Sequence, residues 1–450
     1  AIETDDSGRA SAIRSYSGNM AGTGDTISMG GFTPSGTNNY NNLRDRIQDL
    51  WNGLLVGGEW VESNYYNMDS ISYMLFAVPL LTAHHGTDYF PEITAQFTNI
   101  GKADWNMITP DFSNLFQWGD VTSGYVGYLS TFLYFPFISV ARYISDSPQL
   151  CYLLNTLTVP NNVKDLWDLF GAGNCTQTAP TGVTSHASTG MGINYYHSGW
   201  GVNDSFFAGM IKPRTYSDHE YNSWRDLNLW RQDGWAVYNP KGYYGDPQSE
   251  MFYQNGLLIS GGLPYKDTPA KGQIANEIGA NYVYSAGVVG GNSVATWYGP
   301  PSCSFWGYPP ESLHENSYSY FYYHHANGAD SIITFDRVNA DNPLNLYNFA
   351  NFNANAPLAG SKITAAGGKH QFLMHAPNDP TNSGNRTTWT AENGLTSYFD
   401  TFMSNSTYSE QNMNGSACCW GTFGSGQLKW RFLITDEDTS KVQSFGNVIH

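Results

Sequence analysis

The hydrophobic periodicity of this chain changes once, at Gly171. Over residues 43–55, apolar side chains recur at the spacing of a helix, and Gly57 and Gly58 end the pattern. Residues 171–190 contain almost no large apolar side chain. Beyond them, short alternating runs recur between Gly, Asn, Pro and Asp turns. A helical half followed by a half of antiparallel strands is therefore the architecture that the sequence favours.

We predict an α+β multidomain chain with four parts. They are an extended Gly/Ser/Thr-rich arm (1–36), an α-helical domain of hairpins (37–170), a linker (171–190) and a large antiparallel β-sandwich (191–450). Further helices are predicted at 69–83, Tyr89–Asn99, Gly124–Ile144 and Val163–Phe170. The predicted strands include Trp235–Tyr238, Tyr282–Val289, Tyr318–Tyr323, Ser331–Phe335, His370–His375 and Leu428–Ile434.

The composition restricts the partners of the chain. Its 450 residues carry a formal net charge of −17, which argues against a nucleic acid as partner. Aromatic residues make up 15% of the chain and charged residues 13%, as expected of a β-rich extracellular protein whose aromatic side chains face sugars. The alternative is that the aromatic side chains simply fill a large β core.

Five basic residues are concentrated within a window of 30 residues, between positions 212 and 241. A locally positive groove on an acidic protein can concentrate an anionic ligand. Unrelated surface cations would give the same cluster. The five residues are Lys212, Arg214, Arg225, Arg231 and Lys241.

Cysteines and apolar runs give weaker signals. The five cysteines include no CxxC pair, and one bridge, such as Cys151 to Cys175, is compatible with an oxidising compartment. The uncharged run Val121–Ala141 is 21 residues long, but Pro136 and its polar residues favour a buried or broken helix over a membrane span. No signal peptide is visible at Ala1, and the start looks like a processed end or the start of a fragment.

The stretch 194–244 carries the most chemistry. Asp218 and His219 precede an alternating strand with Leu227 and Leu229, a turn at 233–235 and a second strand ending at 242–244. A titratable histidine between aromatic and cationic residues, at the edge of a β-sheet, suits chemistry on an anionic sugar.

This order resembles the "DH, strand, G-W, strand, G-Y" signature of heparinase II/III-like polysaccharide lyases. Four further segments are similar to motifs of that family, so the resemblance covers about residues 40–450. They are Gly57–Asn67, Ala329–Pro343, Lys369–Pro380 and the closing SFGNVIH. The resemblance implies a partial α/α toroid before the β-sandwich, and cleavage of uronate polysaccharides by β-elimination.

The resemblance also implies site residues. Tyr66 is the first candidate for the catalytic tyrosine, with Tyr65 as the alternate, and His219 is the base or the partner of the substrate carboxylate. Packing tyrosines and a capping histidine are the plain alternatives. The substrate-binding candidates are Arg214 and Arg225 as uronate clamps, His197 on the same face, Trp60, Trp200 and Trp224 as stacking rings, and Asn39 as the group that neutralises the carboxylate.

Two departures from the family pattern matter. The positions that match a structural zinc site of some relatives are Tyr221 and Asn239, so we predict no metal and no cofactor. The location expected for the carboxylate-neutralising residue falls near residue 15, and Asn38, Asn39 or Asn41 would substitute only with altered spacing. The helical part is also about half of a full toroid.

We therefore expect an extracellular or cell-surface lyase that acts on an acidic polysaccharide, with a homo-oligomer left open. The alternative is a non-enzymatic surface, filament or glycan-binding protein on a lyase-like fold. A glycoside hydrolase that uses Glu59 and Glu62 ranks third.

Overall fold

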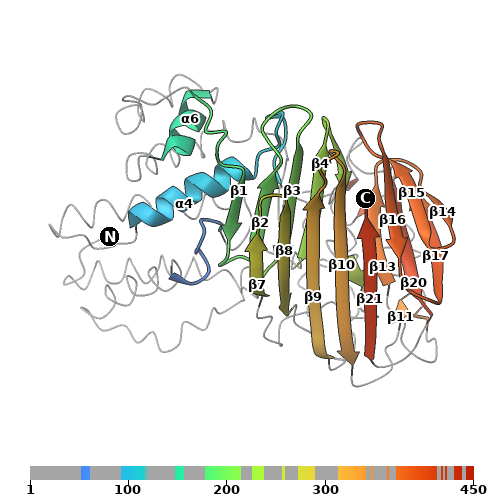
Figure 1. The fold of residues 1–450 in the computed structure, drawn as a ribbon. Helices are drawn as coiled ribbons and strands as arrows, with labels where there is room; N and C mark the ends of the chain where they lie inside the picture. The colour runs from blue at the N-terminus through green and yellow to red at the C-terminus, as the bar shows by residue number, and fades with distance from the viewer. Residues whose placement is uncertain are drawn as a thin grey trace, which may run out of the picture.

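The structure is a computed structural model that describes part of the chain. The described residues are 52–60, 93–116, 118, 147–156, 178–213, 225–237, 256–258, 272–288, 313–340, 346–347, 362–363, 371–412, 417–418, 421–422, 430–437 and 442–450. Figure 1 shows two helices at one end of a broad β region.

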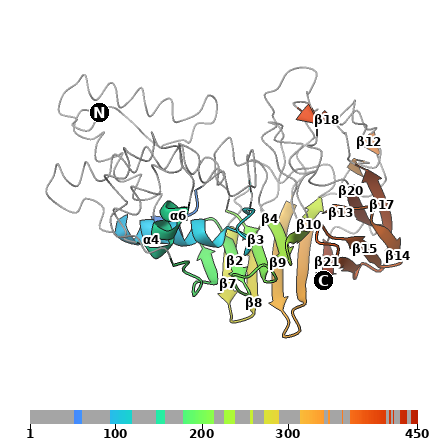
Figure 2. The same cartoon turned by 90° about the horizontal axis from the view of Figure 1, so that it is seen from above.

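The two described helices lie in the predicted helical domain. They are α4 (Ile93–Asn106) and α6 (Pro148–Thr156). Along α4, Phe97, Ile100 and Ala103 are buried at the three-residue spacing that places side chains on one helix face. α4 packs against α6 on one side and against the first two strands on the other (Figure 2). The other predicted helices, and with them most of the predicted toroid, lie outside the described residues.

A five-stranded antiparallel sheet follows, in the order β1-β2-β3-β4-β5. Its strands are β1 (Ser185–Ser188), β2 (Ile193–His197), β3 (Ser205–Ile211), β4 (Arg225–Arg231) and β5 (Gly234–Val237). Every residue of β2, β3 and β5 is buried, so both faces of this sheet are covered. β1 lies entirely within the segment 171–190 that we predicted to be a linker. Its short polar sequence shows no apolar alternation, although its backbone pairs with β2.

The second sheet has eight strands in the order β14-β15-β16-β21-β10-β9-β8-β7. Its strands are β7 (Gly272–Ile278), β8 (Tyr282–Val288), β9 (Leu313–His324), β10 (Asp330–Ala340), β14 (Thr381–Ser383), β15 (Arg386–Thr390), β16 (Thr396–Thr401) and β21 (Val442–Ile449). Alternate residues of β10 are buried and exposed, as expected of a sheet with one face in the core.

A four-stranded sheet extends the sandwich in the order β17-β20-β13-β6. Its strands are β6 (Gly256–Leu258), β13 (Gln371–Ala376), β17 (Ser406–Asn412) and β20 (Trp430–Asp436). Two short pairs complete the described strands: β11 (Leu346–Tyr347) with β12 (Lys362–Ile363), and β18 (Ala417–Cys418) with β19 (Gly421–Thr422).

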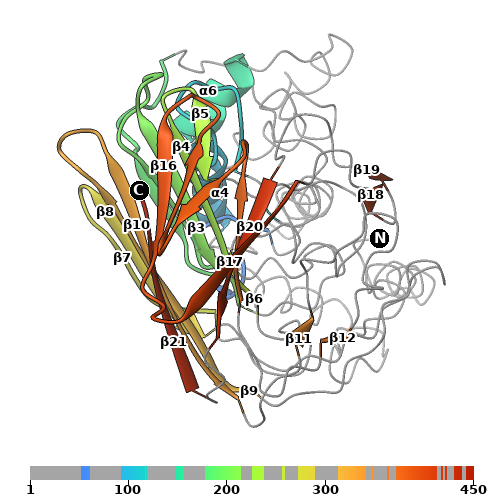
Figure 3. The same cartoon turned by 90° about the vertical axis from the view of Figure 1, so that its right-hand side faces the viewer.

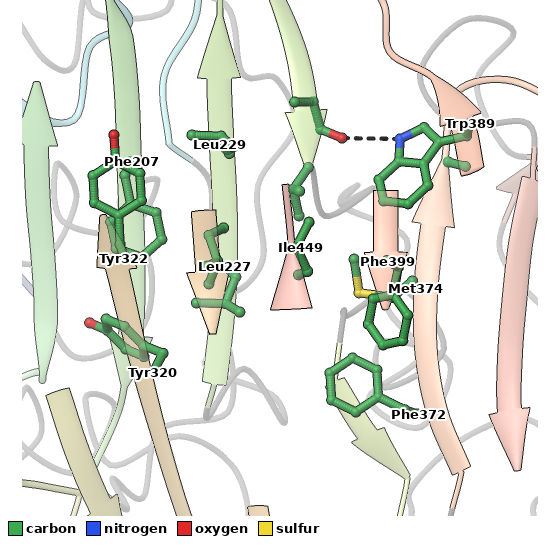
Figure 4. Packing of buried hydrophobic residues seen from close by; sticks show 14 of the residues in the cluster. Phe207, Leu227, Leu229, Tyr320, Tyr322, Phe372, Met374, Trp389, Phe399 and Ile449 are labelled. Carbon is green, nitrogen blue, oxygen red and sulfur yellow. Dashed lines mark hydrogen bonds between the residues drawn. The ribbon is translucent and has the colours of Figure 1, made fainter. Parts of the chain in front are cut away.

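The core lies between the sheets. Figure 3 views the layers from the side, with β7 to β10 in one layer and β3 and β4 in the other. Across this space Phe207 of β3 stacks on Tyr322 of β9, with ring centroids 4.4 Å apart and planes 4° apart (Figure 4). Farther along, the indole of Trp389 donates a hydrogen bond to the carbonyl of Ala236. Each fully buried large side chain of this kind contributes about 1.5–3 kcal/mol.

Two buried ion pairs join the layers at the ends of β4. Arg225 pairs with Asp336 of β10, and Arg231 pairs with Asp330 of β10 over 2.9 Å. Asp330 also accepts hydrogen bonds from Ser205 and from the hydroxyl of Tyr322, each over 2.7 Å. The aspartates are therefore paired and hydrogen-bonded, as buried carboxylates must be.

Among the described residues, no helix is long and apolar enough to cross a membrane. The run 121–141, for which we predicted a buried or broken helix, is outside them. Cys151 of α6 is disulfide-bonded. Its pairing with Cys175 stays a prediction.

Candidate functional site

Six of the predicted site residues lie outside the described part of the chain. They are Tyr65, Tyr66, His219, Arg214, Trp224 and Asn39. Their roles stay predictions. The structure does describe residues shortly before the two segments that carry the catalytic candidates, Glu59 and Trp60 for one segment and Lys212 and Pro213 for the other.

Strand register divides the five-stranded sheet into two faces. Phe207 of β3 pairs with Tyr196 and Leu229, and these residues face the sandwich core. The alternate residues project from the opposite side, which we call the outer face. The outer face carries Tyr195, His197, Phe206, Ala208, Met210, Asp226, Asn228 and Trp230, with Lys212 directly beyond β3. All of them are buried.

The loop 53–60 reaches the outer face through two glycines. Gly57 has φ +97°, and a Cβ there would lie 2.3 Å from the Cα of Ser188 in β1. Gly58 has φ +96°, and a Cβ there would lie 2.4 Å from the backbone nitrogen of Ile100 in α4. The carbonyl of Gly57 accepts a hydrogen bond of 2.8 Å from the hydroxyl of Ser188. Glycine at both positions is therefore what lets this loop wedge between β1 and α4.

Glu59 follows the two glycines and is fully buried against the outer face. The hydroxyl of Tyr195 donates to its Oε1 over 2.5 Å. Burial raises the pKa of Glu59 to about 7, and Tyr195 and the nearby Trp118 indole oppose the shift. The indole N–H lies close to the carboxyl without meeting hydrogen-bond geometry. Burial beside Glu59 raises the pKa of Tyr195 well above 10, so Tyr195 stays protonated.

Trp118 lies beside residues that precede both segments with catalytic candidates. Its ring lies beside Glu59, and the ammonium of Lys212 lies 5.1 Å from its centroid. Lys212 is buried, and a cation over an indole face in such a place is a stabilising arrangement. Glu59, which precedes Tyr65 by six residues, and Lys212, which precedes Arg214 by two, therefore lie against the same aromatic ring.

His197 is part of the packing between the helices and the sheet. Its Nε2 lies 3.0 Å from the carbonyl of Asn106 at the end of α4, and its ring stacks on Trp200 with centroids 4.0 Å apart. Burial lowers the pKa of His197 to about 3, so the ring is neutral at pH 7. This closed setting runs against our prediction that His197 lines the same face as the other substrate-binding candidates.

The two described tryptophan candidates are also held by packing. Trp60 is buried, with 6% of its surface exposed. The ring centroids of Trp200 and Trp105 are 4.3 Å apart, and the indole N–H of Trp200 donates a hydrogen bond to the carbonyl of Val183. Trp60 thus presents little surface for sugar stacking, whereas Trp200 is partly exposed.

Arg225 does not face the outer side of the sheet. It shares the inner face with Leu227 and Leu229, where it pairs with Asp336 and lies over the ring of Tyr318. The prediction that Arg225 clamps a substrate carboxylate is therefore wrong for this geometry, because the guanidinium is already paired between the sheets. Arg231 is paired with Asp330 in the same way. The predicted basic groove thus loses two of its five members, and Arg214 and Lys241 stay predictions.

The burial of Glu59 and of the polar side chains on the outer face was not predicted from the sequence. Glu59 was considered only as one carboxyl of a possible hydrolase pair. The sequence feature that could have pointed to Glu59 is its position directly after Gly57 and Gly58, which end a helical pattern. Within the described ranges, no group of three or more His, Cys, Asp or Glu side chains is arranged to hold a metal ion.

No protein-family model matches the chain, and no curated protein matches it in sequence. Its fold is similar to that of solved polysaccharide lyases. A heparan sulfate lyase from Pedobacter heparinus aligns with a TM-score of 0.53 at 13% identity, over 93% of this chain and 57% of that one. A heparinase III aligns with a TM-score of 0.55 at 11% identity, over 92% of this chain and 57% of that one.

The chain therefore shares a fold with these solved lyases, in alignments that cover 92–93% of it, and it spans about 57% of their length. At such identities the likeness concerns the fold. The β-sandwich that we predicted belongs to this fold, and the motif resemblance and the structural likeness point to the same class of protein.

Proposed function

We propose that the chain is a polysaccharide lyase that cleaves a uronate-containing glycan by β-elimination. The observation that carries the proposal is the fold shared with two lyases over 92–93% of the chain. Those lyases are named for heparan sulfate and heparin, which supports an acidic polysaccharide as the substrate class here.

The chemistry sets three requirements. The proton at C5 of a uronate becomes acidic when the adjacent carboxylate is neutralised, a base must then remove that proton, and an acid must protonate the leaving oxygen. We assign the base and acid to Tyr66 and His219, with Tyr65 as the alternate tyrosine. A tyrosine of ordinary pKa near ~10 needs a neighbouring cation to ionise at neutral pH.

The described geometry supports bringing these groups together. Tyr66 follows Glu59 by seven residues, and His219 follows Lys212 by seven residues. Glu59 and Lys212 both lie beside Trp118. Seven residues span at most about 25 Å, so both segments are long enough to reach one substrate unit above the outer face.

Arg214 remains the candidate for binding the carboxylate of the substrate. It directly follows Lys212 and Pro213, at the end of the described range 178–213. Arg225, in contrast, is paired inside the sandwich. Its planar guanidinium can bind a uronate carboxylate through two hydrogen bonds. Asn39 completes the proposed set as the group that neutralises the carboxylate.

We also propose an extracellular or cell-surface location. The disulfide at Cys151 supports it, because such bonds persist in oxidising compartments.

The test is a panel of uronate polymers incubated with the purified chain. β-Elimination leaves a conjugated unsaturated uronate, which absorbs in the near ultraviolet, and we expect this absorbance to grow with at least one polymer. New reducing ends without that absorbance would indicate hydrolysis. Binding without either signal would favour the non-enzymatic glycan-binding alternative, which the internal pairing of Arg225 and Arg231 supports.

A further inference from the structure

The eight-stranded sheet has one face in the core and one face toward solvent, and its solvent face carries large apolar side chains. Antiparallel sheets usually place polar side chains on the face that water reaches. The central strands of this sheet depart from that rule, and we call the surface that they form the apolar sheet face. Its members are Tyr284 of β8, Phe321 of β9, Ile333 and Phe335 of β10, Phe402 directly after β16, and Val448 of β21.

Strand register joins four of these side chains into one row across the sheet. Phe321 pairs with Tyr284 on one side and with Ile333 on the other. Ile333 in turn pairs with Val448. Side chains that pair directly across antiparallel strands are about 5 Å apart, so these four neighbours form a continuous apolar strip.

A second row lies beside the first and is more exposed. Phe335 pairs with Gly446, and a Cβ added to Gly446 would lie 3.5 Å from the ring of Phe402. The exposed fractions are 69% for Phe402, 49% for Phe335 and 45% for Ile333. Among the described residues, six large apolar side chains are exposed, and four of the six belong to the apolar sheet face. The exposed apolar surface is therefore concentrated here.

No other described element covers this face. Figure 1 looks onto it, with the strands from β7 to β14 side by side. In Figure 3, β7, β8 and β10 form the left margin of the described structure, and the five-stranded sheet lies on their other side. A contiguous apolar surface of this kind marks a site of association.

Charge separates the possible partners. The chain carries a formal net charge of −17, which in general opposes contact between two copies. On the solvent face of this sheet, however, the described Asp, Glu, Lys and Arg side chains balance. They are Glu277, Asp400, Arg337 and Arg386. A face without net charge does not repel its own copy, and it does not attract an acidic polysaccharide.

The chemistry of the most exposed members favours a protein over a sugar. Ile333, Phe335 and Phe402 have no hydrogen-bonding group in their side chains. A sugar presents hydroxyl groups, and its binding sites place polar side chains to meet them. The centre of a protein–protein interface is instead depleted in charge and enriched in aromatic side chains.

The size of the face matches a dimer interface. The eight strands, at a spacing of about 4.8 Å, make it about 38 Å wide, and about six residues along each strand make it about 20 Å tall. The face therefore offers about 760 Å² per copy, close to the ~800 Å² that each partner buries in a typical stable complex.

We propose that the apolar sheet face pairs with the same face of a second copy of this chain, in a dimer with two-fold symmetry. Such symmetry lets both copies use the same residues, and it stacks the two eight-stranded sheets about 10 Å apart. The sandwich core and the five-stranded sheet separate this face from the outer face, against which Glu59 is buried. The dimer is therefore independent of the proposed lyase activity.

The test is the mass of the purified chain in solution, measured by sedimentation velocity at about 1 to 100 µM. Interfaces of this size have dissociation constants at or below the micromolar range, so this range covers the weakest of them. Ile333→Glu and Phe335→Glu each place a carboxylate on the face of both copies. Val202→Glu is the matched control, because Val202 is 60% exposed in the loop between β2 and β3, outside the eight-stranded sheet.

We expect the wild type and Val202→Glu to sediment as dimers. Ile333→Glu and Phe335→Glu should each raise the dissociation constant of the dimer at least about 100-fold, because the interface would then bury one unpaired carboxylate from each copy. Their circular dichroism spectra should match that of the wild type, since both side chains are exposed in the single chain. The thermal unfolding midpoint of the wild type should also rise with protein concentration.

Three results would overturn the proposal. The first is a wild type that is monomeric throughout this range. The second is a dimer that both face variants form as tightly as the wild type, which would place the interface elsewhere. The third is a monomeric wild type that co-sediments with an uncharged polysaccharide or with phosphatidylcholine vesicles, with binding lost in Phe335→Glu, which would assign the face to that partner. A dimer of this kind without lyase activity would reject only the proposed function.

Discussion

Glu59 combines full burial with a pKa near neutrality, and this makes the stability of the chain depend on pH. Its folded pKa of about 7 exceeds the ordinary value of 4.5 because burial disfavours the carboxylate. The folded state therefore binds the proton more tightly than the unfolded state. Below pH 4.5 both states are protonated, and above pH 7 both are ionised. Stability is lost as the pH rises through this window.

We predict that Glu59→Gln removes this loss. Relative to the variant, the wild type should lose about 3 kcal/mol of unfolding free energy between pH 4.5 and pH 8. Chemical denaturation of both proteins at several pH values measures the difference, in which contributions of other groups such as His197 cancel. Parallel stability curves for the two proteins would show that Glu59 titrates normally.

The Arg225–Asp336 pair gives a second prediction at this scale. Arg225→Leu leaves Asp336 buried without its cation, and should cost roughly 3–5 kcal/mol at pH 8. The cost should fall at acidic pH, since burial already raises the pKa of Asp336 and the carboxyl can accept a proton.

A second substitution supplies the control. Arg225→Leu combined with Asp336→Leu removes both charges, and most of the lost stability should return. Urea unfolding of the single and double variants measures this. A double variant as unstable as the single one would mean that packing, rather than charge, explains the loss.

At the scale of elements, the loop 53–60 depends on Gly57. A methyl group there would meet the Cα of Ser188 at 2.3 Å, on a backbone with φ +97°. We predict that Gly57→Ala lowers the unfolding free energy by roughly 2–5 kcal/mol, from left-handed strain and overpacking together. The free energy of unfolding in urea measures the effect.

Gly182 is the matched control, because a Cβ there meets nothing within 4 Å. Gly182→Ala should change the unfolding free energy by less than about 1 kcal/mol. Equal effects of the two substitutions would contradict the close approach of this loop to β1.

How well an element could be predicted depended on how its faces are buried. β8, β9, β10, β13 and β20 have sequence patterns that predicted strands overlapping these elements, although the predictions covered only about half of β9 and β10. β3 reads as a continuous apolar run because both of its faces are covered, so no alternation marks it. β1 is polar and pairs through its backbone alone. Neither strand can therefore be recognised from an alternation of apolar and polar residues in the sequence.

The candidate site was predicted less completely for related reasons. The inner position of Arg225 follows from its alternation with Leu227 and Leu229, so the sequence did contain that signal. The environment of His197 depends on Asn106, which is 91 residues away in the chain. The partners of Glu59 come from β2 and residue 118. Such contacts between distant segments have no local pattern.

At the scale of the whole molecule, an apolar core and two ion pairs at the ends of β4 join the layers of the sandwich, and α4 packs against the first two strands of the five-stranded sheet. The loop carrying Glu59 and the end of β3 carrying Lys212 converge on Trp118. This arrangement, together with the lyase fold, is the basis for assigning catalysis to the segments that follow these two residues.

The most direct test of the account is the turnover of Tyr66→Phe and His219→Ala on whichever uronate polymer the wild type cleaves, measured from near-ultraviolet absorbance with Tyr408→Phe as a remote tyrosine control. We predict that each catalytic variant loses about 100- to 10,000-fold in turnover with an unchanged circular dichroism spectrum, while Tyr408→Phe keeps wild-type turnover. Wild-type turnover in both catalytic variants would contradict the assignment of β-elimination to this pair.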